Sequence, residues 1–143
     1  MPPSTPLTTG GAGAGAVEAA LNVALVVLAA EQVGGAAACL DMAVEYAKIR
    51  HQFNRPIGSF QAIKHKPADL LLLVEVGRSA IDRALLVEHD PARLAAAAAV
   101  AKIWCSDAFT TVTTETFTST AASGSPGSTT RTSTWVPVVL GKF

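Results

Sequence analysis

The sequence predicts an all-α protein, an up-down bundle of three long helices with a disordered segment at each end. Apolar and small residues recur at helical spacing over residues 16–50, 58–88 and 91–114, which is typical of helices that bury one face. The interruptions between these stretches are short and contain proline, which ends helices. Both ends of the chain are rich in threonine, glycine or serine and offer little that could form a core.

These changes in composition divide the chain into three parts. We expect a flexible arm over residues 1–15, a helical domain over residues 16–115 and a low-complexity tail over residues 116–143. The length of 143 residues suits one domain or a piece of one.

Charge and cysteine content exclude several classes of function. Lys plus Arg equals Asp plus Glu at 11 each. The chain therefore lacks the excess of basic residues that would indicate a nucleic-acid partner. Cys39 and Cys105 lie inside apolar helical stretches and lack the C-x-x-C spacing of zinc sites. We therefore expect two buried, reduced thiols, no metal site and a cytoplasmic protein.

The most apolar stretch, residues 19–30, raises the question of a membrane span. Glu18 and Glu31 bound it at 12 residues, whereas a spanning helix needs roughly 18–20. No Lys or Arg precedes Lys48, contrary to the pattern of a signal peptide. We interpret the stretch as part of a core helix. Within the same helix, the Gly-Gly pair at residues 34–35 predicts close packing of a neighbouring helix.

The ends of the other two helices can be predicted from capping residues. Ser59 is a candidate N-cap for the second helix, and Asp90, followed by Pro91, is the candidate for the third. Pro67 lies inside the second helical pattern, so a bend there or a late helix start near Lys66 is expected.

A polar junction, residues 46–61 (YAKIRHQFNRPIGSFQ), joins the first two helices. Pro56 disfavours helix for the residue before it, and Asn54 tolerates a positive φ, so the chain should turn here. Arginines and glutamines stand beside Phe53 and Phe60 in this short segment. Such a rigid turn with aromatic anchors suits an anionic, planar ligand.

The residues of this junction resemble the acyl-CoA dehydrogenase family. Its C-terminal helical domain carries Tyr-Ala-x-x-Arg-x-Gln-Phe-Gly-x-Pro-Ile, then Phe-Gln-x-Ile and a later Ala-Asp. This chain has YAKIRHQFNRPI at residues 46–57, FQAI at residues 60–63 and AD at residues 68–69. The upstream EQVGG at residues 31–35 and the downstream AK at residues 101–102 are also similar to the family.

The resemblance implies a fold, a reaction and a cofactor. Members oxidise the Cα–Cβ bond of an acyl-CoA thioester with FAD, form dimers or tetramers, and end in a four-helix bundle, of which these would be three helices. The family's junction residues contact the FAD of a neighbouring subunit. By position, the resemblance assigns cofactor binding to Arg50, Gln52, Phe53 and Gln61. A guanidinium suits a pyrophosphate, and an aromatic ring can pack on a flat ligand.

The chain also departs from the family pattern. Asn54 replaces a glycine, and Pro67 stands in a helix that the family leaves unbroken, which puts the position of Asp69 in doubt. The family's N-terminal and middle domains have no counterpart here. Its catalytic glutamate follows a Gly-Gly-x-Gly segment, whereas Glu115 is the last acidic residue of this chain. No catalytic residue is therefore assigned, and the chain is expected to be inactive alone.

The tail suggests a shifted reading frame. Residues 116–135 can be back-translated so that reading two bases later gives IHIHGGIGFTWEHDAHLYL, which resembles the family's sequence at this point. First and second codon bases are largely determined by the residues, so a match of this length is hard to obtain by chance. We hypothesise a frameshift near Thr116.

Three functions are compatible with these observations. The first is a fragment of a flavin-dependent acyl-CoA dehydrogenase of lipid catabolism, with acyl-CoA as its substrate. The second is a non-catalytic partner subunit of a heteromeric acyl-CoA dehydrogenase, and the third is a helical interaction module without a cofactor. Bound flavin would separate the first two from the third.

Overall fold

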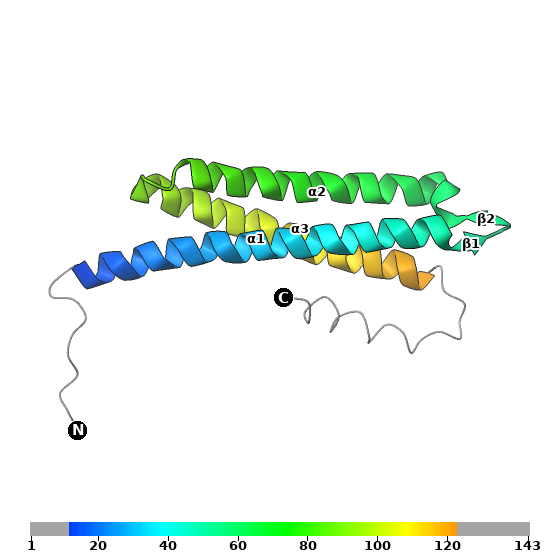
Figure 1. Ribbon diagram of the computed structural model, residues 1–143, viewed down its shortest axis with the longest axis horizontal. Coiled ribbons are helices and arrows are strands. Elements are labelled where there is room, and N and C mark those ends of the chain that lie inside the picture. Colours follow the sequence, from blue (N-terminus) through cyan, green and yellow to red (C-terminus); the bar gives the residue numbers. More distant parts are fainter. Residues whose placement is uncertain (1–11, 123–143) are drawn as a thin grey trace, which may run out of the picture.

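The protein is an all-α, up-down bundle, as the sequence predicts. The computed structural model describes residues 12–122. Helix α1 spans Ala12–Ile49, α2 spans Gln61–Leu86 and α3 spans Pro91–Ala122. Consecutive helices run in opposite directions, so α1 and α3 are parallel and α2 is antiparallel to both (Figure 1).

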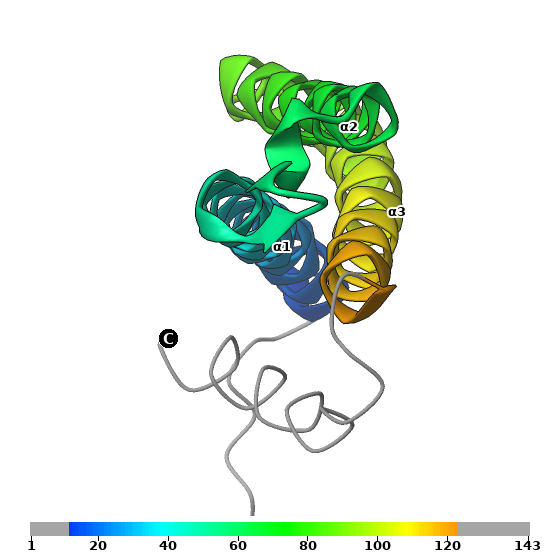
Figure 2. The same ribbon diagram turned by 90° about the vertical axis from the view of Figure 1, so that its right-hand side faces the viewer.

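The core is a single seam between the three helices, which occupy the corners of a triangle in the end-on view (Figure 2). On α1 the buried residues Ala29, Val33, Ala36, Leu40 and Ala47 follow one another at steps of three, four or seven residues, as one face of a helix requires. Side chains of Leu70 and Val74 on α2 meet those of Cys105 and Val112 on α3 in this seam. Both cysteines are buried and free, as expected.

Helix α1 is much longer than its partners can cover. Its first turns extend beyond the ends of α2 and α3 (Figure 1). Val17, Val23 and Val27, in the N-terminal half of α1, are each more than half exposed. On length and composition, the segment Gly13–Ile49 could cross a membrane, a test that core helices also pass. One face of its middle part, from Ala29 to Leu40, is buried in the bundle, which supports the interpretation as a core helix.

Two glycines let the helices approach closely. A Cβ on Gly35 would lie 2.9 Å from the Phe109 ring of α3, so the predicted close packing is confirmed at this residue. At Gly34 a Cβ would meet nothing within 4 Å, so the prediction is wrong for the other half of the pair. The tightest approach is at Gly77 of α2, where a Cβ would lie 2.5 Å from Cγ2 of Val33.

The helix starts correct two expectations and confirm a third. Phe60, not Ser59, caps α2, and no side chain bonds the first turn. Pro67 lies inside an α2 that starts at Gln61, so the late start near Lys66 is wrong. At α3 the Arg93 amide donates to Oδ1 of Asp90 at 3.2 Å, which confirms that N-cap.

The predicted arm and tail lie mostly outside the described residues. Where they overlap the structure, helix is longer than expected: Ala12–Gly15 belong to α1, and residues 116–122 complete α3. Alanines alternate with the glycines of the first segment and favour helix. In the second, the Thr116 hydroxyl donates to the Val112 carbonyl at 2.7 Å, which satisfies a buried hydroxyl inside the helix.

Candidate functional site: the hairpin between α1 and α2

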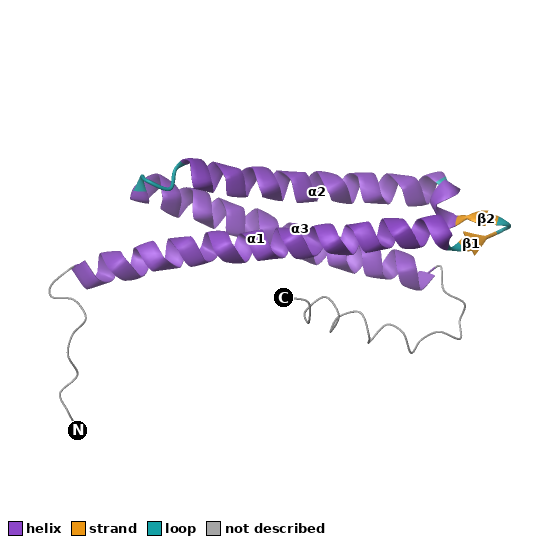
Figure 3. Cartoon of the chain, viewed as in Figure 1, coloured by secondary structure: helices purple, strands orange, loops and turns teal. Residues whose placement is uncertain are grey.

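The junction between α1 and α2 folds into a minimal β-hairpin at one end of the bundle (Figure 3). Strands β1 (His51–Gln52) and β2 (Arg55–Pro56) pair antiparallel, with Gln52 opposite Arg55. The two turn residues both have positive φ, 52° at Phe53 and 62° at Asn54, as a type I′ turn requires. The sequence predicted this conformation for Asn54 but not for Phe53.

Backbone contacts hold the hairpin firmly against the bundle. The Ile57 amide donates to the Arg50 carbonyl at 2.8 Å, closing the hairpin at its base. Ile57 then enters the core at 4% exposure and begins the short 3-10 helix η1, Ile57–Ser59. Gly58 lies so close to α1 that an added Cβ would be 3.0 Å from the Ala47 carbonyl oxygen.

The four predicted cofactor-binding residues all lie on or beside this hairpin. Arg50 is half-buried where α1 ends, and its amide donates to the Tyr46 carbonyl at 2.9 Å. Gln52 is half-buried in β1, Phe53 is 88% exposed in the turn, and Gln61 is the exposed first residue of α2. The geometry thus gathers a cation, two amides and an aromatic ring at one end of the molecule.

The side chains of Phe53, Arg55 and Phe60 form a stacked cluster at the turn. The spacing of these residues in the sequence did not predict it. The Arg55 guanidinium carbon lies 3.9 Å from the centroid of the Phe60 ring, within the range of a cation–π contact. Phe53 and Phe60 meet edge to face, with centroids 6.2 Å apart and an interplanar angle of 76°. We call these three side chains the Phe60 stack. The sequence named them as members of the junction but not as one contacting unit.

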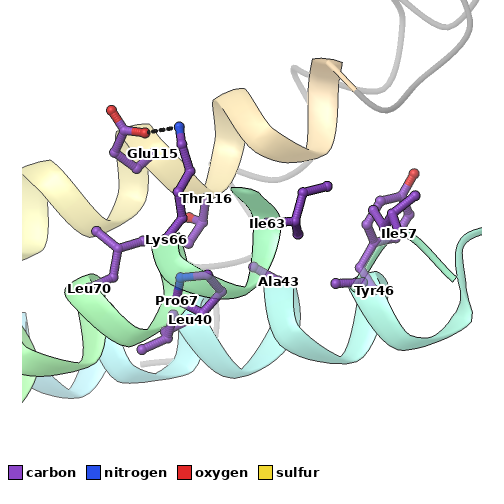
Figure 4. Close-up of a pocket in the computed structure, with 11 residues that line it drawn as sticks. Leu40, Ala43, Tyr46, Ile57, Ile63, Lys66, Pro67, Leu70, Glu115 and Thr116 are labelled. Carbon is purple, nitrogen blue, oxygen red and sulfur yellow. Dashed lines mark hydrogen bonds and ion pairs between the residues drawn. The ribbon is translucent and has the colours of Figure 1, made fainter. Parts of the chain in front are cut away.

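A shallow apolar hollow lies between the hairpin end of α1, the start of α2 and the last turns of α3 (Figure 4). Tyr46, Ile57 and Ile63 are among its lining residues. At its rim, Nζ of Lys66 lies 2.7 Å from Oε2 of Glu115 and ties α2 to α3. The two charged groups at the rim are thus paired with each other, and most of the other lining residues are apolar.

A second polar cluster joins α1 to α3 away from the hairpin. Nζ of Lys102 donates to Oε1 of Gln32 at 3.0 Å and to Oγ of Ser106 at 2.7 Å. Lys102 is thus a paired residue in the seam between the helices. Within residues 12–122, no group of three or more His, Cys, Asp or Glu side chains could hold a metal ion.

Comparisons with known proteins support the family resemblance that the hairpin residues indicate. Residues 11–131 match the family model described as acyl-CoA dehydrogenase, C-terminal domain. Acyl-CoA dehydrogenase IpdE2 of Mycolicibacterium smegmatis is 42% identical over 94 residues, which cover 66% of this chain and 29% of that protein. IpdE2 of Mycobacterium tuberculosis is 45% identical over 94 residues, covering 66% of this chain and 28% of that protein.

A third relative is larger. Acyl-CoA dehydrogenase FadE34 of Mycobacterium tuberculosis is 49% identical over 82 residues, covering 56% of this chain and 12% of that protein. The chain therefore spans less than a third of the length of each of these three relatives. The family model, in contrast, covers most of this chain and describes one domain. On this evidence the chain belongs to the acyl-CoA dehydrogenase family and carries its C-terminal helical domain.

Proposed function

We propose that this chain is a fragment of a flavin-dependent acyl-CoA dehydrogenase and that its hairpin binds the FAD of a neighbouring subunit. The whole enzyme would remove hydrogen from Cα and Cβ of an acyl-CoA thioester in lipid catabolism. The observation that carries the proposal is the hairpin, because Arg50, Gln52, Phe53 and Gln61 all lie on or beside it.

The residues of the hairpin fit the outer part of a dinucleotide. The guanidinium of Arg50 would pair with a pyrophosphate by charge and by two parallel hydrogen bonds. Gln61 lies in the first turn of α2, where the positive end of the helix dipole favours an anion. Phe53 offers an exposed ring to a flat ligand. FAD, when bound, would supply the hydride acceptor.

The same residues do not complete an active site. A base that takes the α-proton must reach it within about 2.6–3.2 Å, and the resemblance places the family's glutamate after Glu115, where this chain has no acidic residue. We therefore propose that the chain alone does not oxidise acyl-CoA. It would act in a homo- or hetero-oligomer whose other subunits supply the rest of the flavin site.

A frameshift near Thr116 would explain the missing glutamate. The family match runs to residue 131, past the proposed point, so the match itself does not locate a shift. Resequencing the gene around the codon for Thr116 is the direct test. If the frame is shifted, restoring it should add helix after Ala122 and raise the melting temperature without creating turnover. An uninterrupted frame would refute this part of the proposal.

A non-catalytic partner subunit remains the second candidate, because the hairpin alone could serve the flavin of another chain. A cofactor-free interaction module is the third candidate. The exposed apolar side chains on α1 support it, because such a surface favours association over a free monomer. Two buried, free thiols support a cytoplasmic location for all three.

FAD binding separates the first two candidates from the third. The purified chain is titrated with FAD, alone and with a full-length acyl-CoA dehydrogenase, and flavin fluorescence is followed. Arg50→Gln should weaken binding about tenfold, because a charge-assisted bond to phosphate is lost. Arg83→Gln, an equal charge change on the exposed face of α2, should leave binding unchanged.

The outcomes of this titration are distinct. Saturable binding that depends on Arg50, without dye reduction by acyl-CoA, supports the fragment or partner-subunit proposal. Binding that appears only with the full-length enzyme supports the same pair. Absence of flavin binding under both conditions favours the cofactor-free module, and robust acyl-CoA-dependent dye reduction by the chain alone would overturn the fragment proposal.

A further inference from the structure

Phe53 has an unusual combination of backbone and exposure. Its φ of 52° is a conformation that residues with a Cβ rarely adopt, and bulky residues least of all. Burial of the ring does not compensate for this strain, because the residue is 88% exposed. Strained residues persist where the surroundings hold them and often mark functional positions. Contacts from outside the Phe53 ring are therefore needed to hold this residue in place.

Phe60 makes contacts that can hold Phe53 in place. Its amide donates to the Ile57 carbonyl at 3.1 Å, and its carbonyl accepts from the amides of Ile63 and Lys64 at 3.0 Å each. These bonds fix the residue to the start of α2. Its ring then meets Phe53 edge to face and lies under the guanidinium of Arg55. In addition to the backbone bonds at the base of the hairpin, the strained turn thus contacts the start of α2 through one aromatic ring.

We propose that Arg55 and Phe60 are positioning residues that hold Phe53 ready to stack on the flat ring of a nucleotide, the adenine end of the dinucleotide. The ligand part of this inference rests on the proposed function of the hairpin. Arg55 acts through Phe60, and neither side chain needs to touch the ligand. The contribution is preorganisation, since an ordered ring loses less freedom on binding than a mobile one.

The first experiment tests positioning without any ligand. Carbon chemical shifts of Phe53 report its backbone angles, and ring-current shifts of the Arg55 side chain report stacking. In Phe60→Leu, we expect the Phe53 shifts to move toward those of extended backbone and the Arg55 ring-current shift to vanish. Arg55→Gln should produce part of this change, whereas Arg55→Lys, which keeps a cation over the ring, should produce little.

Unchanged Phe53 shifts in Phe60→Leu would overturn the positioning role, whatever the chain binds. Lys64→Gln, four residues further on the exposed side of α2, is the control and should change neither signal. Circular dichroism on each variant distinguishes a local change in the hairpin from loss of the bundle.

The second experiment uses FAD and inorganic pyrophosphate as probes of the same chain. Phe60→Leu should weaken FAD binding about tenfold, in line with the energy of stacking a base on an aromatic ring, and leave pyrophosphate binding unchanged. Phe60→Trp should restore FAD binding. Equal losses for both probes, or no loss for either, would overturn the ligand part. If the wild-type chain binds neither probe, alone or with the full-length enzyme, the proposed function and the ligand part both fail, and the chemical shifts still decide the positioning role.

Discussion

At the scale of single residues, two glycines of similar local sequence have opposite roles. Gly77 faces Val33 across the α1–α2 contact, where a Cβ would lie 2.5 Å from a stiff, β-branched side chain. Gly34 faces open space in the middle of α1. Hydrophobicity and periodicity do not distinguish them, because the difference lies in the neighbouring helix.

This contrast gives a matched pair of substitutions. Gly77→Ala should lower the free energy of unfolding by about 1–2 kcal/mol, because overpacking outweighs the gain in helix propensity. Gly34→Ala should raise it by up to about 1 kcal/mol, since alanine is the better helix former and nothing obstructs its methyl group. Urea unfolding followed by circular dichroism measures both. Equal effects of the two substitutions would contradict the packing that we describe.

The buried thiols link stability to alkaline pH. Burial raises the pKa of Cys39 above its ordinary value of 9.0. Burial also raises the pKa of Cys105, and the charge of Lys102 partly opposes that shift. Since the folded thiols hold their protons more tightly than the unfolded ones, their contribution is complete below pH 9.0 and is lost as pH rises through the folded pKa.

The expected result is a fall in unfolding free energy above pH 9.0 that is smaller in Cys39→Ser/Cys105→Ser than in the wild type. A serine hydroxyl does not ionise in this range, so the double variant removes the thiol part and leaves lysine and tyrosine titration in place. Urea unfolding at a series of pH values measures the difference. Parallel curves for the two proteins would refute the link.

At the scale of elements, α2 and α3 differ in how their N-termini are capped. The carboxylate of Asp90 accepts the Arg93 amide, and its carbonyl accepts the Leu94 amide at 2.8 Å. At α2 the cap is the backbone of Phe60, and Ser59 is exposed in η1. Aspartate and serine are both good N-caps. Asp90 directly precedes the first residue of its helix, whereas Ser59 lies one residue too early.

Asp90→Ala should therefore lower the free energy of unfolding by about 1 kcal/mol, because an amide of the first turn loses its acceptor. Asp90→Asn keeps a capping oxygen and should cost only a few tenths of that. Ser59→Ala is the control and should change little. Thermal or urea unfolding decides the matter, and a Ser59→Ala cost equal to that of Asp90→Ala would show that α2 is capped by its serine after all.

At the scale of the whole molecule, α1 presents an apolar stripe to solvent. Val23, Val27, Ala30, Gly34 and Ala38 recur every three or four residues on α1 and are all exposed. Side chains this small and apolar allow another helix to approach closely. Contiguous apolar surface of more than a few hundred Å² usually marks an interface, so the isolated chain should associate with itself.

Sedimentation at increasing concentration tests this expectation. The wild-type chain should show species larger than a monomer, and Val23→Gln/Val27→Gln should weaken association at least severalfold while helix content stays the same. Leu72→Gln, on α2, is a control outside the stripe. A monodisperse monomer at high concentration would contradict the role of the stripe.

Local patterns in the chain were sufficient to predict the three helices, the turn at Asn54, the cap at Asp90 and the two buried thiols. Each depends on a residue and its near neighbours: helical periodicity, a tolerance for positive φ, a carboxylate before a proline, and an apolar segment around a cysteine. The location of the candidate site could be predicted for the same reason, because Arg50 to Gln61 is continuous in sequence.

Only the tertiary structure decided the remainder. The positive φ of Phe53 together with its edge-to-face contact with Phe60, and the close approach of Val33 to Gly77, are seen only in the tertiary structure. Thr116, expected in a structureless tail, is 7% exposed in α3 beside the hollow. These outcomes depend on contacts between residues distant in sequence or on a balance of strain and packing, and a local pattern contains neither.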